Sequence, residues 1–312
     1  MIEIEGYGSG RTFRQSSRHR RCFPAGALFR AAVAALVLPL MVAILASNIA
    51  EAVAPELATD WVEGDHNRAR LTAGAVESAA PGSAYAFFEI TMDKGWKTYW
   101  RNPGSAGGIP PEFDWSKSRN VASVEVLYPV PKVISDNAGD VIGYMEHAVF
   151  PVRITPERPG EPVQLDVSAN YGICKKLCVP VAVDLALTLP PGDLPPASPD
   201  GQAALDAVPR SADRVKPGDP SGFKAESVIE GPDARVILQA RFPGAADAAE
   251  VFLYIEDGRF IPMPVRQEAQ GEVVSFIIDL SDPKDLMRVK GARVLATLKG
   301  ELGQSESAFV ID

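Results

Sequence analysis

Hydrophobic and polar residues alternate with a period of two along much of the chain from residue 84 onward. This period places side chains on the two faces of a β-strand in turn, so it predicts strands that are buried on one face. No stretch of helix length repeats its apolar residues every 3.6 positions. The clearest alternation in the first half covers residues 84–92, 124–126, 150–154, 163–169 and 181–189.

Short strands separated by glycine and proline turns favour β-sandwiches, and their spacing predicts two of them. The first is expected over residues 58–190. A proline-rich stretch, residues 191–220, follows and is predicted to be a semi-rigid linker, because proline cannot donate a ladder hydrogen bond. Alternation then resumes, which predicts a second, smaller sandwich over residues 221–312.

The first 52 residues have the layout of a secretory signal peptide. An arginine-rich stretch precedes an apolar run at residues 31–46, and two A-x-A sites follow at residues 50–54. A membrane anchor needs about 20 apolar residues, whereas this run is shorter and contains Pro39. We therefore expect cleavage, a mature N-terminus between residues 53 and 56, and an exported protein.

Composition excludes several classes of protein. The net charge of −9 disfavours a nucleic-acid partner, since such proteins usually carry a basic excess. Three cysteines and three histidines are too few for a disulfide-dense scaffold or a four-cysteine zinc module. Cys22 would leave with the signal peptide, so the mature chain would keep only Cys174 and Cys178, in an oxidising compartment.

These two cysteines lie in the sequence NYGICKKLCVP, residues 170–180, between two predicted strands. In an extended chain their Cα atoms would be about 13 Å apart, but a disulfide needs about 4.4–6.8 Å. The segment is therefore expected to curl into a tight turn or one helical turn. Lys175 and Lys176 lie between the cysteines, and we expect them to lower the thiol pKa by stabilising thiolate.

Three interpretations of the cysteine pair stay open from the residues alone. A structural bridge would close only five residues, which is worth roughly 2 kcal/mol in chain entropy, so a redox-active pair is favoured over it. The third interpretation is a Cu(I) site, because soft ligands suit that ion. Its additional ligand would come from His66, Met92, Met145 or His147.

Five sequence segments in order carry a family resemblance: GWKTYWRNPG at 95–104, GIPPEFDW at 108–115, VLYPVPKV at 126–133, Gly143-Tyr144, and NYGICKKLCVP. Together they resemble the periplasmic N-terminal domain of the thiol:disulfide interchange protein DsbD, and most of all the ScsB-type N-terminal region. The resemblance covers roughly residues 60–190. It implies an all-β fold, an immunoglobulin-like β-sandwich with a redox pair at one end, followed here by the second, smaller β-sandwich.

The resemblance also implies a cap loop that shields the reduced pair. By position, the candidate cap is the glycine-containing stretch from Asp140 to Tyr144, although the family's own cap residues do not match it literally. No cofactor and no metal are expected. The predicted site consists of Cys174 and Cys178 as the catalytic pair, with Tyr171, Lys175, Lys176, Asp140 and Tyr144 around it for substrate binding or capping.

A relay of electrons follows from the same resemblance. The sequence contains neither an eight-helix membrane domain nor a thioredoxin-like domain, so we expect a separately encoded membrane thiol-reductant transporter to supply electrons. Periplasmic thioredoxin-like or disulfide isomerase proteins would receive them, and the chain would act as a thiol-disulfide oxidoreductase. Cys174 should lie deeper, and Cys178 should meet the partner. The alternative is a non-enzymatic sandwich that binds copper or a protein partner.

Overall fold

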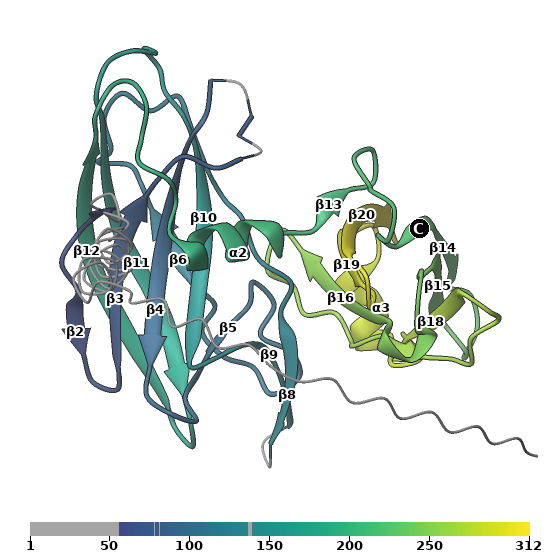
Figure 1. Ribbon diagram of the computed structural model, residues 1–312. Helices are drawn as coiled ribbons and strands as arrows, with labels where there is room; N and C mark the ends of the chain where they lie inside the picture. Colours follow the sequence, from purple (N-terminus) through teal and green to yellow (C-terminus); the bar gives the residue numbers. More distant parts are fainter. Residues whose placement is uncertain (1–55, 78, 81, 137–138) are drawn as a thin grey trace, which may run out of the picture. The chain divides into compact units, whose positions relative to one another are not determined.

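The computed structural model describes residues 56–77, 79–80, 82–136 and 139–312 of the chain (Figure 1). The predicted signal peptide, residues 1–52, lies outside these described residues. The fold is all-β, as the alternation predicted, and nearly every strand pairing is antiparallel. In the part of the chain that the structure describes, no helix is long and apolar enough to cross a membrane.

The first sandwich consists of two six-stranded sheets that enclose one apolar core. One sheet has the order β1-β3-β4-β10-β7, with β2 paired to β3, and the other has the order β12-β11-β5-β9-β8, with β6 paired to β11. The strands of the first sheet are β1 (Leu57–Ala58), β2 (Val62–Gly64), β3 (Asn67–Ala73), β4 (Ala84–Met92), β7 (Ser123–Val126) and β10 (His147–Thr155). Those of the second are β5 (Lys97–Tyr99), β6 (Glu112–Asp114), β8 (Lys132–Asp136), β9 (Gly139–Met145), β11 (Val163–Cys174) and β12 (Cys178–Leu189).

The long hairpin of β11 and β12 carries the cysteines. Its two strands pair without a break from Val163↔Leu189 to Cys174↔Cys178. Along β11 the odd-numbered residues from 163 to 173 are buried in the core. Because side chains alternate between faces, the even-numbered Cys174 lies on the outer face of the sheet. The register of this hairpin therefore fixes on which side the thiols lie.

The second sandwich has a separate core built from two four-stranded sheets. Their orders are β13-β20-β19-β16 and β14-β15-β18-β17. The strands are β13 (Arg210–Ser211), β14 (Ser221–Val228), β15 (Arg235–Arg241), β16 (Glu250–Ile255), β17 (Val265–Arg266), β18 (Val273–Asp279), β19 (Arg293–Lys299) and β20 (Gln304–Val310). A 3₁₀ turn, η1 (Ala246–Ala248), and a helix, α3 (Pro283–Val289), connect strands.

The proline-rich linker includes the helix α2 (Pro199–Asp206). Ser198 caps its N-terminus, since the Ser198 side chain accepts a hydrogen bond from the backbone N–H of Gly201. Pro199 stands at the first helical position, where its missing N–H leaves no hydrogen bond unmade. Leu205 of this helix packs against Tyr85 and Phe87 of β4. The domain boundaries drawn from the sequence stay predictions.

Two sequence predictions need correction. The stretch from Asp140 to Tyr144 is part of strand β9 and not a loop. Strand β9 contains two glycines, Gly139 and Gly143, which interrupt the alternation of apolar and polar side chains. Gly143 is required there, because a Cβ would lie 2.0 Å from the carbonyl oxygen of Thr98 in the neighbouring β5. The short helix α3 also has no periodic apolar stripe long enough to predict it; Asp282 caps it through the N–H of Lys284.

Candidate functional site

The two cysteines face each other across the end of the β11–β12 hairpin. Cys174 is the last residue of β11 and Cys178 the first residue of β12, and they form the final cross-strand pair. Directly opposed residues of antiparallel strands have Cα atoms about 4.5–5.5 Å apart, within the range of about 4.4–6.8 Å that a disulfide requires. Both are free thiols with their sulfurs 3.1 Å apart. The tight turn expected from the sequence is therefore confirmed.

The two thiols differ in their access to solvent. Cys174 is 9% exposed, whereas Cys178 belongs to the exposed residues. Cys174 packs in a small apolar cluster with Tyr99 and Val141, to which Ala106 and Ile134 add partly buried contacts. An incoming disulfide can therefore reach the sulfur of Cys178 more readily than that of Cys174. The deeper position predicted for Cys174 is confirmed.

Tyr99 is the polar neighbour of both sulfurs. Its hydroxyl lies 2.9 Å from the sulfur of Cys178, and it also hydrogen-bonds Cys174. Burial, followed by the hydrogen bonds with Cys178 and Cys174, raises the pKa of Tyr99 well above its usual value. The phenol consequently keeps its proton at neutral pH. It can donate a hydrogen bond to a thiolate that forms on either cysteine.

Glycines make room for the Tyr99 ring on the outer face of the sheet. A Cβ on Gly108 would lie 2.2 Å from the ring, and one on Gly172 would lie 3.1 Å from it. Gly172 also donates its N–H to the carbonyl of Ile109, which holds the segment around Ile109 against β11. A side chain at Gly108 would force the ring to move, and one at Gly172 would press on both the ring and the side chain of Ile109. Within NYGICKKLCVP, Gly172 therefore leaves room for the Tyr99 ring on the outer face of the sheet.

The pKa of Cys174 is raised above its ordinary value of 9.0. Burial is the main cause, and the hydrogen bond with Cys178 adds to it, while the hydrogen bond from Tyr99 and the charge of Lys97 oppose the rise. This corrects the expectation that the lysines of the turn lower the pKa of both thiols. The cation that acts on Cys174 is Lys97, a buried residue of β5 paired with Cys174 across the sheet.

The lysines of the turn point away from Cys174. Lys175 donates from its ammonium to the backbone carbonyl of Lys94, 3.0 Å away, and its side chain lies along Gly95. Lys176 and Leu177 complete the turn, and both are exposed. The structure therefore brings Lys175 and Lys176 to the surface around Cys178.

Of the predicted cap stretch from Asp140 to Tyr144, Val141 lies beside the cysteines. Val141 of β9 contacts the cluster of Tyr99 and Cys174. Asp140 instead accepts a hydrogen bond from Ser135 near the end of the β8–β9 hairpin. Tyr144 belongs to the opposite face, since it donates to the carbonyl of Pro129 and packs its ring on Phe150. Residues 137–138 of this hairpin lie outside the described part of the chain.

Tyr171 is also a residue of the core. It lies on the inner face of β11, where its hydroxyl donates to the Asn67 side chain over 2.8 Å. Its position three residues before Cys174 makes it odd-numbered on a strand whose odd residues point inward. The alternation of β11 therefore separates Tyr171 from the thiols, although the two are close in sequence.

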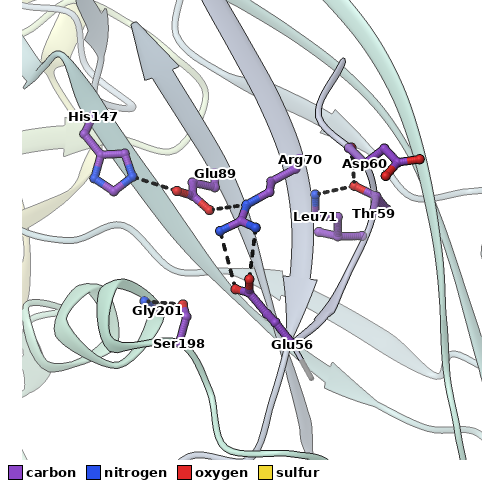
Figure 2. A network of polar contacts seen from close by, with 9 residues as sticks. All are labelled: Glu56, Thr59, Asp60, Arg70, Leu71, Glu89, His147, Ser198 and Gly201. Carbon is purple, nitrogen blue, oxygen red and sulfur yellow. Dashed lines mark hydrogen bonds and ion pairs between the residues drawn. The ribbon is translucent and has the colours of Figure 1, made fainter. Parts of the chain in front are cut away.

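No third His, Cys, Asp or Glu ligand joins the cysteines within the described residues. The group with metal-ligand spacing there is Glu89, His147 and Asp200, from β4, β10 and α2. Figure 2 shows His147 and Arg70 both pointing at the carboxylate of Glu89. Arg70 also bonds Glu56. His147, one of the four residues considered from the sequence as an additional ligand for Cu(I), is thus engaged with Glu89, 3.0 Å away.

Sequence reasoning missed Tyr99 and Lys97, whereas Val141 lies within the predicted cap stretch. Tyr99 and Lys97 belong to the aromatic segment GWKTYWRNPG, which entered the sequence analysis only as part of the family resemblance. The burial of Trp96 and Trp100 agrees with core packing. Tyr99 lies 79 residues before Cys178 in the chain, so no local spacing relates them. The order of the segments in the family resemblance was the one available signal.

Comparison with known proteins identifies the first sandwich. Residues 70–190 match the family model "Thiol:disulfide interchange protein DsbD, N-terminal". No curated protein matches the chain in a sequence search.

Solved structures support the same assignment of the fold. The crystal structure of the N-terminal periplasmic domain of ScsB from Proteus mirabilis superposes with a TM-score of 0.59 at 20% identity, and the match covers 83% of this chain and 100% of that one. Bovine butyrophilin gives a TM-score of only 0.20 at 12% identity, over 77% of this chain and 94% of that one. Residues 70–190 therefore match the N-terminal domain of the thiol:disulfide interchange protein DsbD, which confirms the resemblance seen in the sequence.

Proposed function

We propose that the chain is a periplasmic thiol-disulfide interchange protein that passes electrons through Cys174 and Cys178. One observation carries this proposal: two free thiols lie 3.1 Å apart across a turn, one buried and one exposed. Thiol-disulfide exchange passes through a mixed disulfide, so it needs one accessible sulfur and a second sulfur that resolves the adduct. The geometry of the hairpin supplies both.

The exchange balances with this dithiol as the electron donor. The thiolate of Cys178 attacks one sulfur of the partner's disulfide, and the other partner sulfur leaves as a thiolate that takes up a proton. Cys174 then loses its proton and attacks the sulfur of Cys178, which releases the second partner thiol. The Cys174–Cys178 disulfide remains. Two electrons and two protons have passed to the partner.

Tyr99 supports both steps as a positioning residue. Its protonated hydroxyl hydrogen-bonds both sulfurs, so it can donate first to the thiolate of Cys178 and then to that of Cys174. The raised pKa of Cys174 favours its protonated thiol form, and Cys174 is buried whereas Cys178 is exposed. A thiol is a much weaker nucleophile than a thiolate. Cys178 is therefore the sulfur that makes the first attack.

The partners follow from the direction of this exchange. One dithiol delivers one electron pair and must then be reduced again, which we assign to a separately encoded membrane thiol-reductant transporter. Periplasmic thioredoxin-like or disulfide isomerase proteins would be the acceptors. The signal-peptide layout of residues 1–52 supports the periplasmic location.

Trapping tests the proposal. Cys174→Ala removes the resolving thiol, so a mixed disulfide through Cys178 should accumulate on non-reducing gels of exported protein. Cys178→Ala is the matched variant and should trap little, because the remaining sulfur is buried. An adduct with Cys178→Ala alone would reverse the two roles. If neither variant traps a partner while both remain folded, the proposal fails.

A further inference from the structure

The turn between the cysteines exposes an apolar side chain. Leu177 is 79% exposed, the highest value among the large hydrophobic residues that the structure describes. It directly precedes Cys178, and the continuous pairing of β11 with β12 fixes the turn in place. An exposed side chain beside a reactive sulfur is positioned to contact whatever binds that sulfur. Its apolar surface would be removed from water in the complex.

Three lysines lie in the turn that precedes Cys178 or next to that turn. Lys175 and Lys176 lie in the turn, and Lys94 lies next to them, because its carbonyl accepts the hydrogen bond from the ammonium of Lys175. All three are exposed. We call these three lysines and Leu177 the cysteine rim.

The carboxylates beside the cysteine rim already have partners. Asp93 binds the imidazole of His66 over 2.7 Å. Glu146 accepts the backbone N–H of Gly95 over 2.8 Å. Among the described residues the three exposed lysines outnumber these two carboxylates, so the carboxylates reduce the positive charge without reversing its sign. The whole chain, in contrast, carries a net charge of −9, so the cysteine rim is a local positive region on an acidic protein.

From these observations we infer that Cys178 selects partners whose reactive disulfide lies on an acidic surface next to an apolar recess. The rim would attract such a partner while the rest of the chain repels it, which orients the encounter toward the sulfur. Leu177 would occupy the recess. This inference rests on the proposed exchange function and adds the chemical class of the partner to it.

Small disulfides of opposite charge test the electrostatic part. The probes are 3,3′-dithiodipropionate (anionic), cystamine (cationic) and bis(2-hydroxyethyl) disulfide (neutral). The reduced full-length chain carrying Cys22→Ser is oxidised by each probe, and each rate is divided by that of 2-mercaptoethanol with the same probe. At low salt the anionic probe should react at least fivefold faster than the cationic one. In 1 M salt, where the Debye length is about 3 Å, the difference should vanish.

Two matched double variants show where the selectivity arises. Lys175→Gln with Lys176→Gln should reduce the anion-to-cation ratio several-fold, toward one, as expected for the loss of two charges several ångströms from the sulfur. Lys224→Gln with Lys290→Gln makes the same change in net charge with exposed lysines of the second sandwich, and it should leave the ratio unchanged. Equal effects of the two pairs, or a ratio near one in the unmodified chain, would overturn the inference.

An aromatic anionic probe, 5,5′-dithiobis(2-nitrobenzoate), tests the contact of Leu177. Leu177→Ser should slow this probe about threefold and leave 3,3′-dithiodipropionate unchanged. If both slow equally, the substitution distorts the turn and the apolar contact is refuted. If the chain reacts with none of the disulfides, the proposed exchange function itself fails. If it reacts with all of them and the ratio of its rate to that of 2-mercaptoethanol is the same for every probe, only the charge selectivity is refuted.

Discussion

At the scale of single residues, Tyr99 is the residue that hydrogen-bonds both cysteines. Its hydroxyl is buried, protonated and within hydrogen-bond distance of Cys178. A hydrogen bond to an ionised group contributes about 1.5–3 kcal/mol, which is enough to change the thiolate population by about tenfold or more. The residue is therefore expected to influence the rate of exchange without touching the partner.

Tyr99→Phe tests that influence. With Cys22→Ser and Cys174→Ala also present, Cys178 is the sole thiol, and its alkylation by iodoacetamide at pH 7 should slow several-fold, because the thiolate loses its donor. The pH dependence of the rate should move to higher pH. A merely structural role would change the rate at every pH by the same factor, and an unchanged profile would contradict the assignment.

Cys174 gives a second test at this scale. In a chain with Cys22→Ser and Cys178→Ser, burial still raises the pKa of Cys174. Its alkylation rate should reach half of the maximum at a pH above 9.0, the ordinary value for a cysteine. The denatured chain is the control and should titrate at the ordinary value. A midpoint below 9.0 in the folded chain would show that the lysines dominate after all.

At the scale of elements, the polar network of Figure 2 links strands β3, β4 and β10. Burial alone would raise the pKa of Glu89, but the hydrogen bonds from His147 and Arg70 outweigh it and hold that pKa below its usual value. The hydrogen bond with Glu89 raises the pKa of His147 in turn, against its partial burial. The two shifts describe one ion pair.

The sign of each shift fixes the pH window of this pair. The lowered pKa of Glu89 gives stability that is present above its ordinary 4.5 and is lost as the pH falls through the lowered value. The raised pKa of His147 gives stability that is present below its ordinary 6.5 and is lost as the pH rises through the raised value. His147→Ala should therefore destabilise the protein most between these two values, by about 1 kcal/mol given the exposure of the imidazole.

Urea unfolding at pH 5.5 and pH 9 measures this effect. The loss caused by His147→Ala should be larger at pH 5.5. In a Glu89→Gln background the same substitution should cost about the same at both pH values, because the partner charge is gone. A pH dependence that survives in Glu89→Gln would assign it to Asp200 or another group.

Alternation allowed most of the long strands to be predicted from sequence, because one face of each is buried. β11 and β12 show this best, since their odd-numbered residues form the core. β9 escaped prediction because Gly143 has no side chain where it meets Thr98. The cysteines were predictable from their spacing. Tyr99 was not, because its contact with Cys178 depends on the order of strands in the sheet, with β5 between β11 and β9.

At the scale of the whole molecule, both thiols of the described chain belong to the first sandwich. The solved ScsB domain matches 83% of this chain. Because the first sandwich spans less than half of the sequence, that match includes a large part of the second sandwich as well. The second sandwich contains no cysteine, so we expect it to act as a scaffold or in docking. One dithiol in such a chain can carry electrons but cannot supply them.

The most direct test of the central claim is the redox equilibrium of Cys174 and Cys178. The full-length chain with Cys22→Ser is equilibrated in graded glutathione and dithiothreitol buffers, and its free thiols are counted after quenching. The account predicts a reversible two-electron transition at a potential more oxidising than about −300 mV, the usual upper bound for structural disulfides. A pair that stays oxidised throughout the series would be a structural bridge and would contradict the account.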